Sequence, residues 1–230
     1  MMALVWITLI TRINMATFAQ MKTWVSKRLQ DPNNTAVSST DVGDMINAAL
    51  SYWKNERFYF NEIQTDPPLS LTQSNPVITL PTDWLCPSID DTFVIQYSGI
   101  RYPLKKISET MYNAFYLSNG VGQPWYFAKL ATGGYQVYPI PDRDYDLIAY
   151  YIKDYVDFSG DSDTNDFSEK ATNLLQYTAA AYGSRDFRQD MAMYQAFWNQ
   201  ALIEENNLLA TTRKANATGS VTIFSMLNTY

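Results

Sequence analysis

The sequence has no histidine and a single cysteine among its 230 residues, so two chemically versatile side chains are almost missing. Without histidine there is no general base that titrates near neutral pH, and the commonest metal ligand is absent. Cys86 alone cannot form an internal disulfide or a cysteine-cluster zinc site, and its neighbours Leu85 and Pro87 favour a small, buried, apolar role. We therefore expect no cofactor, no bound metal and no enzymatic activity.

Charge is also scarce, because only 17% of the residues are charged, with 17 basic and 23 acidic side chains and a formal net charge of −6. No cluster of lysine and arginine forms a basic patch, so tight binding to nucleic-acid phosphates is not expected. A mildly acidic surface suits a channel wall that DNA slides past, but it also suits most soluble proteins. Aromatic residues are plentiful at 15%; they suit protein–protein contacts or fill a β-rich core.

A hydrophobic run long enough to cross a bilayer is not apparent. Residues 1–10 are apolar but too few to span a membrane, and they lack the basic segment and cleavage site of a secretion signal. A more ordinary start follows at Met15. Residues 1–14 are therefore either an extra upstream segment or an arm that docks on a neighbouring molecule, and we expect no membrane association.

Helical periodicity is strongest from Thr40 to Glu62, the stretch around which the chain is organised. One face of this predicted helix is apolar, and the stripe ends in the aromatic residues 58–60, which we expect to lie in a helix-bundle core. Residues 17–30 predict a first helix that folds back on it. Near the other end, residues 167–182 predict a helix that Gly183 ends, and residues 186–213 predict a long last helix.

Residues 66–159 show a shorter period and many turn signals, which predict antiparallel strands. Hairpins are indicated at Ser98-Gly99 and around Gly133-Gly134, and Ser108 is placed to cap a short helix. The predicted class is α+β, with a helical bundle built from both chain ends and a β-rich antiparallel insertion. The predicted boundaries are an arm at 1–14, the bundle at 15–65 and 160–214, the β-rich domain at 66–159, and an extended tail at 215–230.

Clustered carboxylates offer the main alternative to a purely structural protein. Asp142, Asp144 and Asp146 could hold a metal or transfer protons, but such runs are usually solvated turns. Asp161 and Asp163 begin like a calcium loop, yet its sixth position holds an aspartate rather than glycine and its twelfth is a threonine. We expect neither an enzyme nor a calcium site here.

Several landmarks occur in a fixed order along residues 15–212. They are the helix ending in residues 56–62, Leu80-Pro81-Thr82-Asp83-Trp84-Leu85, Gly122-Gln123-Pro124-Trp125-Tyr126, Tyr138-Pro139-Ile140-Pro141, and Asp163-Thr164-Asn165-Asp166-Phe167 before a helix. In this order they resemble the head–tail adaptor, or connector, proteins of short-tailed and related bacteriophages. Residues 1–14 and 215–230 lie outside the resemblance.

The resemblance implies a structural virion protein that is assembled in the host cytoplasm and located in the neck. It implies a ring of identical subunits, twelve in number, docked under the portal protein. Such a ring extends a channel through which DNA passes without sequence recognition, and it supports the nozzle and tube proteins of the tail. The alternative that we keep open is a carbohydrate- or protein-binding accessory module of the tail.

The last segment of the chain is apolar and follows a Gly-Ser hinge, so it either pairs with its own domain or adds a strand or plug to another subunit. Together with the resemblance, this predicts a portal-binding tail. Its predicted contact residues are Val221, Ile223, Phe224, Met226, Leu227 and Tyr230.

Overall fold

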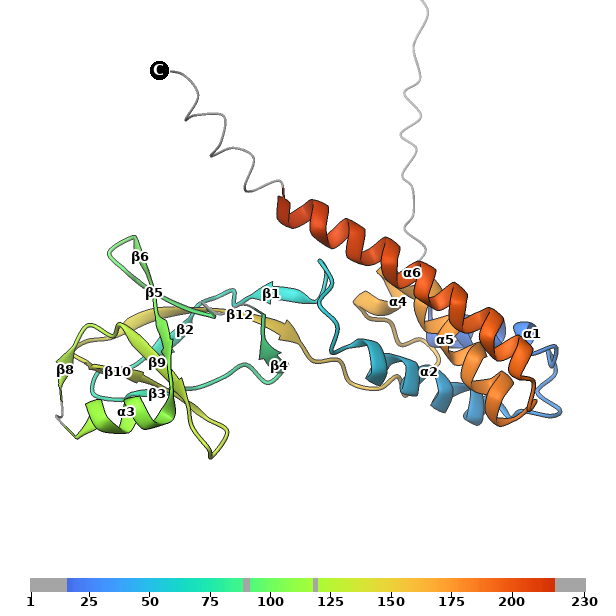
Figure 1. Ribbon diagram of the computed structural model, residues 1–230, viewed down its shortest axis with the longest axis horizontal. Helices are drawn as coiled ribbons and strands as arrows, with labels where there is room; N and C mark the ends of the chain where they lie inside the picture. The colour runs from blue at the N-terminus through green and yellow to red at the C-terminus, as the bar shows by residue number, and fades with distance from the viewer. Residues whose placement is uncertain (1–15, 89–91, 118–119, 218–230) are drawn as a thin grey trace, which may run out of the picture. The chain divides into compact units, whose positions relative to one another are not determined.

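The computed structural model describes residues 16–88, 92–117 and 120–217 (Figure 1). Helices lie at both ends of this described chain, and the strands lie between them. This order confirms the predicted α+β class, with a β-rich insertion between N- and C-terminal helices.

The chain divides into two compact units, which are described separately here. The helical unit contains the described residues up to Trp53 together with Val156–Ala210. The β unit contains the described residues of Lys54–Tyr155 together with the end of the last helix, from Thr211 to Ala217. The long last helix therefore contributes residues to both units.

Five helices contribute to the helical unit. They are α1 (Phe18–Arg28), α2 (Ser39–Trp53), α4 (Asp166–Lys170), α5 (Thr172–Asp186) and α6 (Met191–Ala217). The start of α1 is fixed by a capping box in which the backbone N–H of Gln20 donates to the Thr17 hydroxyl and the Gln20 side chain accepts the N–H of Thr17. The bounds of α1 agree with the helix predicted at 17–30.

The return from α1 to α2 is organised by one carboxylate. Asp31 accepts the hydroxyl and backbone N–H of Thr35 and the backbone N–H groups of Ala36 and Val37, at 2.6–2.9 Å. Asp31 itself is buried. These bonds give the backbone N–H groups of the loop an acceptor inside the protein, so they fix the tight loop that brings α2 back against α1.

Two helices form the centre of the helical unit, because α2 and α5 bury their apolar faces against each other. The Trp53 indole is 2% exposed, and its Nε1–H donates to the Thr178 hydroxyl at 2.8 Å. Gly183 lies inside α5, so the expectation that it ends the helix was wrong. A Cβ at that position would lie 2.6 Å from Leu29 Cδ1 and 3.0 Å from Met45 Sδ, so the missing side chain allows close packing.

The helix predicted from residue 40 to about residue 60 ends earlier, at Trp53. Beyond it, the Asn61 side chain accepts the backbone N–H of Phe58 at 2.9 Å and donates to the Glu56 carbonyl at 2.7 Å. These bonds close a turn and use backbone groups that a longer helix would need. Phe58 and Phe60 stack on each other and are buried, and both belong to the β unit.

The β unit contains three sheets within its described residues. The first has six strands: β1 (Glu62–Gln64), β2 (Leu69–Leu71), β4 (Trp84–Pro87), β5 (Phe93–Tyr97), β6 (Ile100–Pro103) and β12 (Tyr145–Lys153). The second has four strands: β3 (Val77–Ile78), β7 (Lys105–Ile107), β9 (Tyr126–Lys129) and β10 (Tyr135–Tyr138). The third pairs β8 (Val121–Gly122) with β11 (Ile140–Pro141).

Most of these pairings are antiparallel, as predicted, and both expected hairpins are present. In the β5–β6 hairpin, Ser98 and Gly99 adopt φ values of 50° and 79°, as the two-residue turn requires. The pairs β7–β9 and β8–β11 run parallel, which the sequence pattern did not indicate. Strand β12 is central, since β1, β2, β4 and β5 all pair with it.

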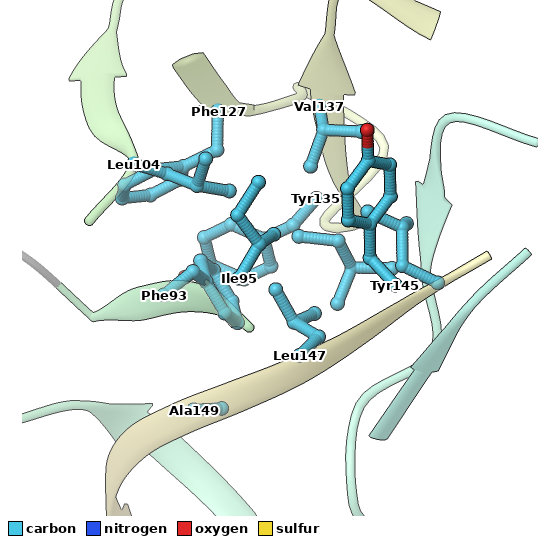
Figure 2. Packing of buried hydrophobic residues seen from close by; sticks show 11 residues of the cluster. Phe93, Ile95, Leu104, Phe127, Tyr135, Val137, Tyr145, Leu147 and Ala149 are labelled. Carbon is cyan, nitrogen blue, oxygen red and sulfur yellow. The ribbon is translucent and has the colours of Figure 1, made fainter. Parts of the chain in front are cut away.

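Alternation along the strands builds the core of the β unit (Figure 2). Phe93 and Ile95 of β5 point to the same side as Tyr145, Leu147 and Ala149 of β12, and all five are buried. Phe127, Tyr135 and Val137 come from the four-stranded sheet and pack into the same cluster. Because alternate residues of each strand face the same side of the sheet, the two larger sheets share one apolar layer between them.

The short helix α3 (Glu109–Tyr116) packs on β9 and β10 and begins at Ser108, as predicted. The Ser108 hydroxyl accepts the backbone N–H of Met111 at 3.2 Å. Phe115 of this helix stacks on Tyr138, and the Tyr112 hydroxyl donates to Gln136 at 2.7 Å.

Candidate interaction surfaces

The predicted portal-binding residues lie outside the described part of the chain. These residues are Val221, Ile223, Phe224, Met226, Leu227 and Tyr230. The predicted arm at residues 1–14 lies outside it as well. The surfaces considered below therefore belong to the two described units.

The acidic cluster at residues 142–146 closes a turn. Asp142 accepts the Tyr145 hydroxyl at 2.6 Å and Arg143 Nη2 at 3.0 Å, and these bonds hold the pKa of Asp142 below its ordinary value. Burial and the bond to Asp142 raise the pKa of Tyr145 to about 12. Asp144 accepts the backbone N–H of Gln73 at 2.7 Å. Each of these two carboxylates is occupied by its own local partners, so they do not converge on a reacting centre.

The second acidic segment, around residues 159–165, is also held by local bonds. Asp163 accepts the backbone N–H groups of Gly160 at 2.7 Å and Ser159 at 2.8 Å, which lower the pKa of its carboxyl. Asp161 pairs with Lys22 of α1 at 2.6 Å. The loop thus fixes the start of α1 against α4. Nowhere in the described part of the chain do three or more cysteine, aspartate or glutamate side chains gather in a way that could hold a metal ion.

One hollow of about 630 Å³ opens in the β unit. Its lining is Arg57, Pro87, Ser88, Thr92, Lys106, Phe127 and Tyr135. The guanidinium of Arg57 already makes two bonds to Glu62, at 2.6 and 2.8 Å. The described lining holds cations, hydroxyls and rings but no carboxylate or thiol. It therefore offers no nucleophile–base pair for catalysis.

Cys86 lies elsewhere in the same unit, on β4, and it is half-buried. Burial raises the pKa of its thiol, which makes the reactive thiolate scarcer near neutral pH.

The outer side of α6 is the first candidate interaction surface. We define the α6 outer face by six exposed residues spaced three or four apart, Ala192, Ala196, Asn199, Ile203, Asn206 and Ala210. Gln195, Gln200 and Asn207 flank it and are also exposed. The inner side of α6 packs through aromatic rings, with Trp198 against Tyr52 and Trp53.

This α6 outer face is unusual because it carries no charged residue over about 27 Å of helix, at 1.5 Å per residue. An exposed helix face in water usually carries lysine and glutamate, whereas protein–protein contacts are depleted in charge. Ile203 is 51% exposed at the middle of the face. These features favour a surface that another protein covers.

A second candidate surface of the helical unit runs along α1. We define the α1 hollow by its lining residues Ala19, Gln20, Thr23, Trp24 and Lys27, which enclose about 330 Å³. The Trp24 ring meets Tyr177 of α5 edge-on, and Arg28 lies 4.5 Å over the indole. The ring is therefore held in place while its free side contributes to the hollow.

The third candidate surface is an apolar rim of the β unit, beside α3 and β8. Leu117, Val121 and Trp125 are 86%, 66% and 50% exposed. Gly120 packs closely on Tyr138, since a Cβ there would lie 2.5 Å from the Tyr138 hydroxyl oxygen, and the N–H of Trp125 donates to the Tyr138 carbonyl. Large apolar side chains exposed in this way favour a contact with another protein.

The sequence pattern did not single out the α6 outer face, although residues 191–203 contain no charged residue. The aromatic residues 125–127 were a sequence-based candidate for a contact with the tail or the next subunit, and Trp125 is 50% exposed whereas Phe127 is buried. A strand prediction cannot tell which of its apolar residues stays outside.

An α+β protein with charge-poor exposed faces and no convergent catalytic groups in its described residues has the features of an assembly protein. The sequence matches the family model of the SU10 adaptor protein over residues 16–223, and the chain belongs to this family. No curated protein matches the chain. The head–tail adaptor resemblance is thus confirmed at the level of the family.

Family membership implies a phage structural adaptor that contacts other head and tail components and resides in the virion neck. None of the helices in the described ranges is both long and apolar enough to span a membrane.

Proposed function

We propose that the protein forms a ring of identical subunits, twelve in number, that docks under the portal protein. The ring extends the DNA channel and carries the nozzle or tube proteins of the tail. The family match over residues 16–223 is the observation that carries this proposal. The exposed charge-poor faces agree with it, since a ring subunit needs at least two lateral surfaces.

In this proposal the domain boundaries expected from the sequence have separate tasks. The bundle, expected at residues 15–65 and 160–214, builds the ring, and the β-rich domain, expected at residues 66–159, meets the tail; the two compact units divide instead after Trp53 and after Tyr155. The apolar rim at Leu117, Val121 and Trp125 suits a contact with a tail protein or the next subunit. Residues 1–14 act as an arm on a neighbour.

Helix α6 continues to Ala217, so it includes the first residues of the tail that the sequence places at 215–230. In this proposal that tail binds the portal. It contains no charged residue, and the two residues before it are Arg213 and Lys214. An uncharged, apolar segment gains most by burial in an apolar groove of the partner. The contact residues remain the proposed set, Val221, Ile223, Phe224, Met226, Leu227 and Tyr230.

The experiment is co-purification with the portal protein of the same virus. Deletion of residues 216–230 is expected to leave a folded protein by circular dichroism that no longer binds the portal. The matched pair Phe224→Asp and Asn228→Asp adds the same charge at an apolar and a polar position. Phe224→Asp should weaken binding at least tenfold, while Asn228→Asp should bind as the natural sequence does.

Unchanged portal binding by the truncated chain contradicts the tail as the clamp. Failure of the full chain to bind the portal at all contradicts the docking proposal as a whole. Electron microscopy of the complex then counts the subunits around the ring and tests the number twelve.

A further inference from the structure

We infer that the α6 outer face of one copy packs into the α1 hollow of the next copy around the ring. This inference rests on the proposed function and deepens it, because it names the two lateral surfaces of the subunit. Both surfaces belong to the helical unit, so the contact involves one compact unit of each copy.

The helical unit carries a net negative charge. Its described residues, 16–53 and 156–210, carry 6 basic and 12 acidic side chains, a formal charge of −6. Two such units repel each other, and the repulsion is largest where charged side chains face each other at short range. Close approach of two copies therefore costs least where the facing surfaces carry no unpaired acidic side chains.

Both surfaces named here meet that condition. The α6 outer face has no charge from Ala192 to Ala210. Among the described residues, the α1 hollow is lined by four uncharged side chains and Lys27, without a carboxylate. Lys27 therefore brings one positive charge to a contact with a unit whose formal charge is −6. The contact is thus uncharged on the α6 side and carries a single cation on the α1 side.

Shape and hydrogen bonding also suit the contact. Ile203 lies at the middle of the α6 outer face, with Ala196 before it and Ala210 after it on the same face. Ala19 and Trp24 give the lining of the α1 hollow an apolar part against which Ile203 can pack. The amides along the α6 outer face both donate and accept hydrogen bonds, so they can pair with the partner's polar groups without adding charge.

The contact joins two different surfaces of the same chain, so it is heterologous. A heterologous contact repeats from copy to copy and closes into a ring when the rotation allows, whereas a contact of the α6 outer face with itself stops at a dimer. This difference can be measured directly, since covalent capture of the two arrangements gives different products.

The first experiment is disulfide capture within the portal complex. In a Cys86→Ser background, Thr23→Cys and Asn199→Cys are introduced together, and the chain is coexpressed with the portal protein of the same virus. Mild oxidation is expected to give a ladder of linked copies beyond the dimer on a non-reducing gel. Each single variant, and the control pair Thr23→Cys with Thr132→Cys in an exposed turn, should give no ladder.

The outcomes separate the two levels of the proposal. Rings that form on the portal without a ladder overturn this inference but leave the proposed function intact. Dimers from Asn199→Cys alone show that α6 meets α6 and also overturn it. The absence of any portal complex overturns both.

A second experiment uses charge in place of capture. Ile203→Asp puts a carboxylate on the α6 outer face, whereas Val156→Asp puts one on an aliphatic residue of the same unit that is 88% exposed and lies off both surfaces. Ile203→Asp should lower the yield of rings at least tenfold with an unchanged thermal midpoint of the monomer. Val156→Asp should leave the yield unchanged, and equal yields for the two variants overturn the inference.

Discussion

Replacing Gly183 by alanine tests the packing at the centre of the helical unit, because two opposing effects act on one methyl group. Inside a helix, alanine is favoured over glycine by about 1 kcal/mol. Against this, the new Cβ would lie 2.6 Å from Leu29 Cδ1, 3.0 Å from Leu29 Cδ2 and 3.0 Å from Met45 Sδ. Leu29 is fully buried and Met45 nearly so, which leaves little room for either side chain to move.

The magnitude follows from the competition between these two effects. Inserting a methyl into a well-packed core costs about 1–3 kcal/mol. With three contacts at or below 3.0 Å, we place the cost in the middle of that range, about 2 kcal/mol. After subtraction of the helix preference, Gly183→Ala should lower the free energy of unfolding by about 1 kcal/mol.

The assay is urea unfolding followed by circular dichroism, with Gly43→Ala as the matched control in α2. At Gly43 the nearest atom to a new Cβ is the Phe18 ring edge at 3.0 Å, and the next contacts are at 3.6 and 3.8 Å. Gly43→Ala should therefore be the more stable of the two variants by about 1 kcal/mol. A rise in unfolding free energy for Gly183→Ala refutes the packing argument.

A double-mutant cycle identifies the neighbour that is responsible. Leu29→Ala alone should cost about 2–5 kcal/mol, as for other large-to-small changes in a core. In the Gly183→Ala background the same change should cost about 1 kcal/mol less, because the shortened side chain removes the clash. Additive effects of the two changes would show that Leu29 is not the residue in the way.

Two further predictions concern buried hydrogen bonds. Thr178→Val should leave the Trp53 Nε1–H without an acceptor and lower the free energy of unfolding by about 1–3 kcal/mol in urea titrations. Thr178→Ser keeps a hydroxyl acceptor and should retain most of the stability. The bonds from Thr35 and Val37 hold the pKa of Asp31 well below its usual range, so its stabilising effect is complete above about pH 4–5 and declines as the pH falls. Asp31→Asn should therefore be less stable at pH 7, and its deficit against the natural sequence should shrink on acidification; a constant deficit contradicts the assignment.

Local signals predicted much of this fold because they depend on neighbouring residues. The Ser98-Gly99 turn and the Ser108 cap are of this kind, and both are present. The end of α2 was missed because no glycine or proline follows Trp53. Beyond Trp53, the Asn61 side chain accepts the backbone N–H of Phe58 and donates to the Glu56 carbonyl, and these two bonds form a turn where the helix was expected to continue.

At Gly183 the helix was predicted to end too early. This glycine lies inside α5, where its missing side chain allows close packing. Its reason lies in Leu29 and Met45, which are far away in the sequence. Strand partners were out of reach for the same reason, because alternation assigns a face to a strand but does not name its neighbour. The parallel pair β7–β9 could not be read from either segment alone.

The candidate surfaces divide in the same way. The apolar content of residues 221–230 is visible in the sequence and remains a proposal. The α6 outer face needed the structure, because residues of one helix become a surface only when its other side is seen to pack through Trp198. Its lack of charge then distinguishes it from an ordinary solvated face.

The place of β12 in the chain sets the order in which the protein can fold during synthesis. Strands β1, β2, β4 and β5 all precede it, and each needs β12 as its neighbour. Until residues 145–153 have left the ribosome, β5 can pair with β6 alone, and Phe93 and Ile95 lack the facing residues Ala149 and Leu147 of β12. Helix α2 lacks its partner α5 for longer still, because α5 follows β12 in the chain. A chain halted before this point exposes both apolar layers at once, so we expect it to be a substrate for chaperones and proteases.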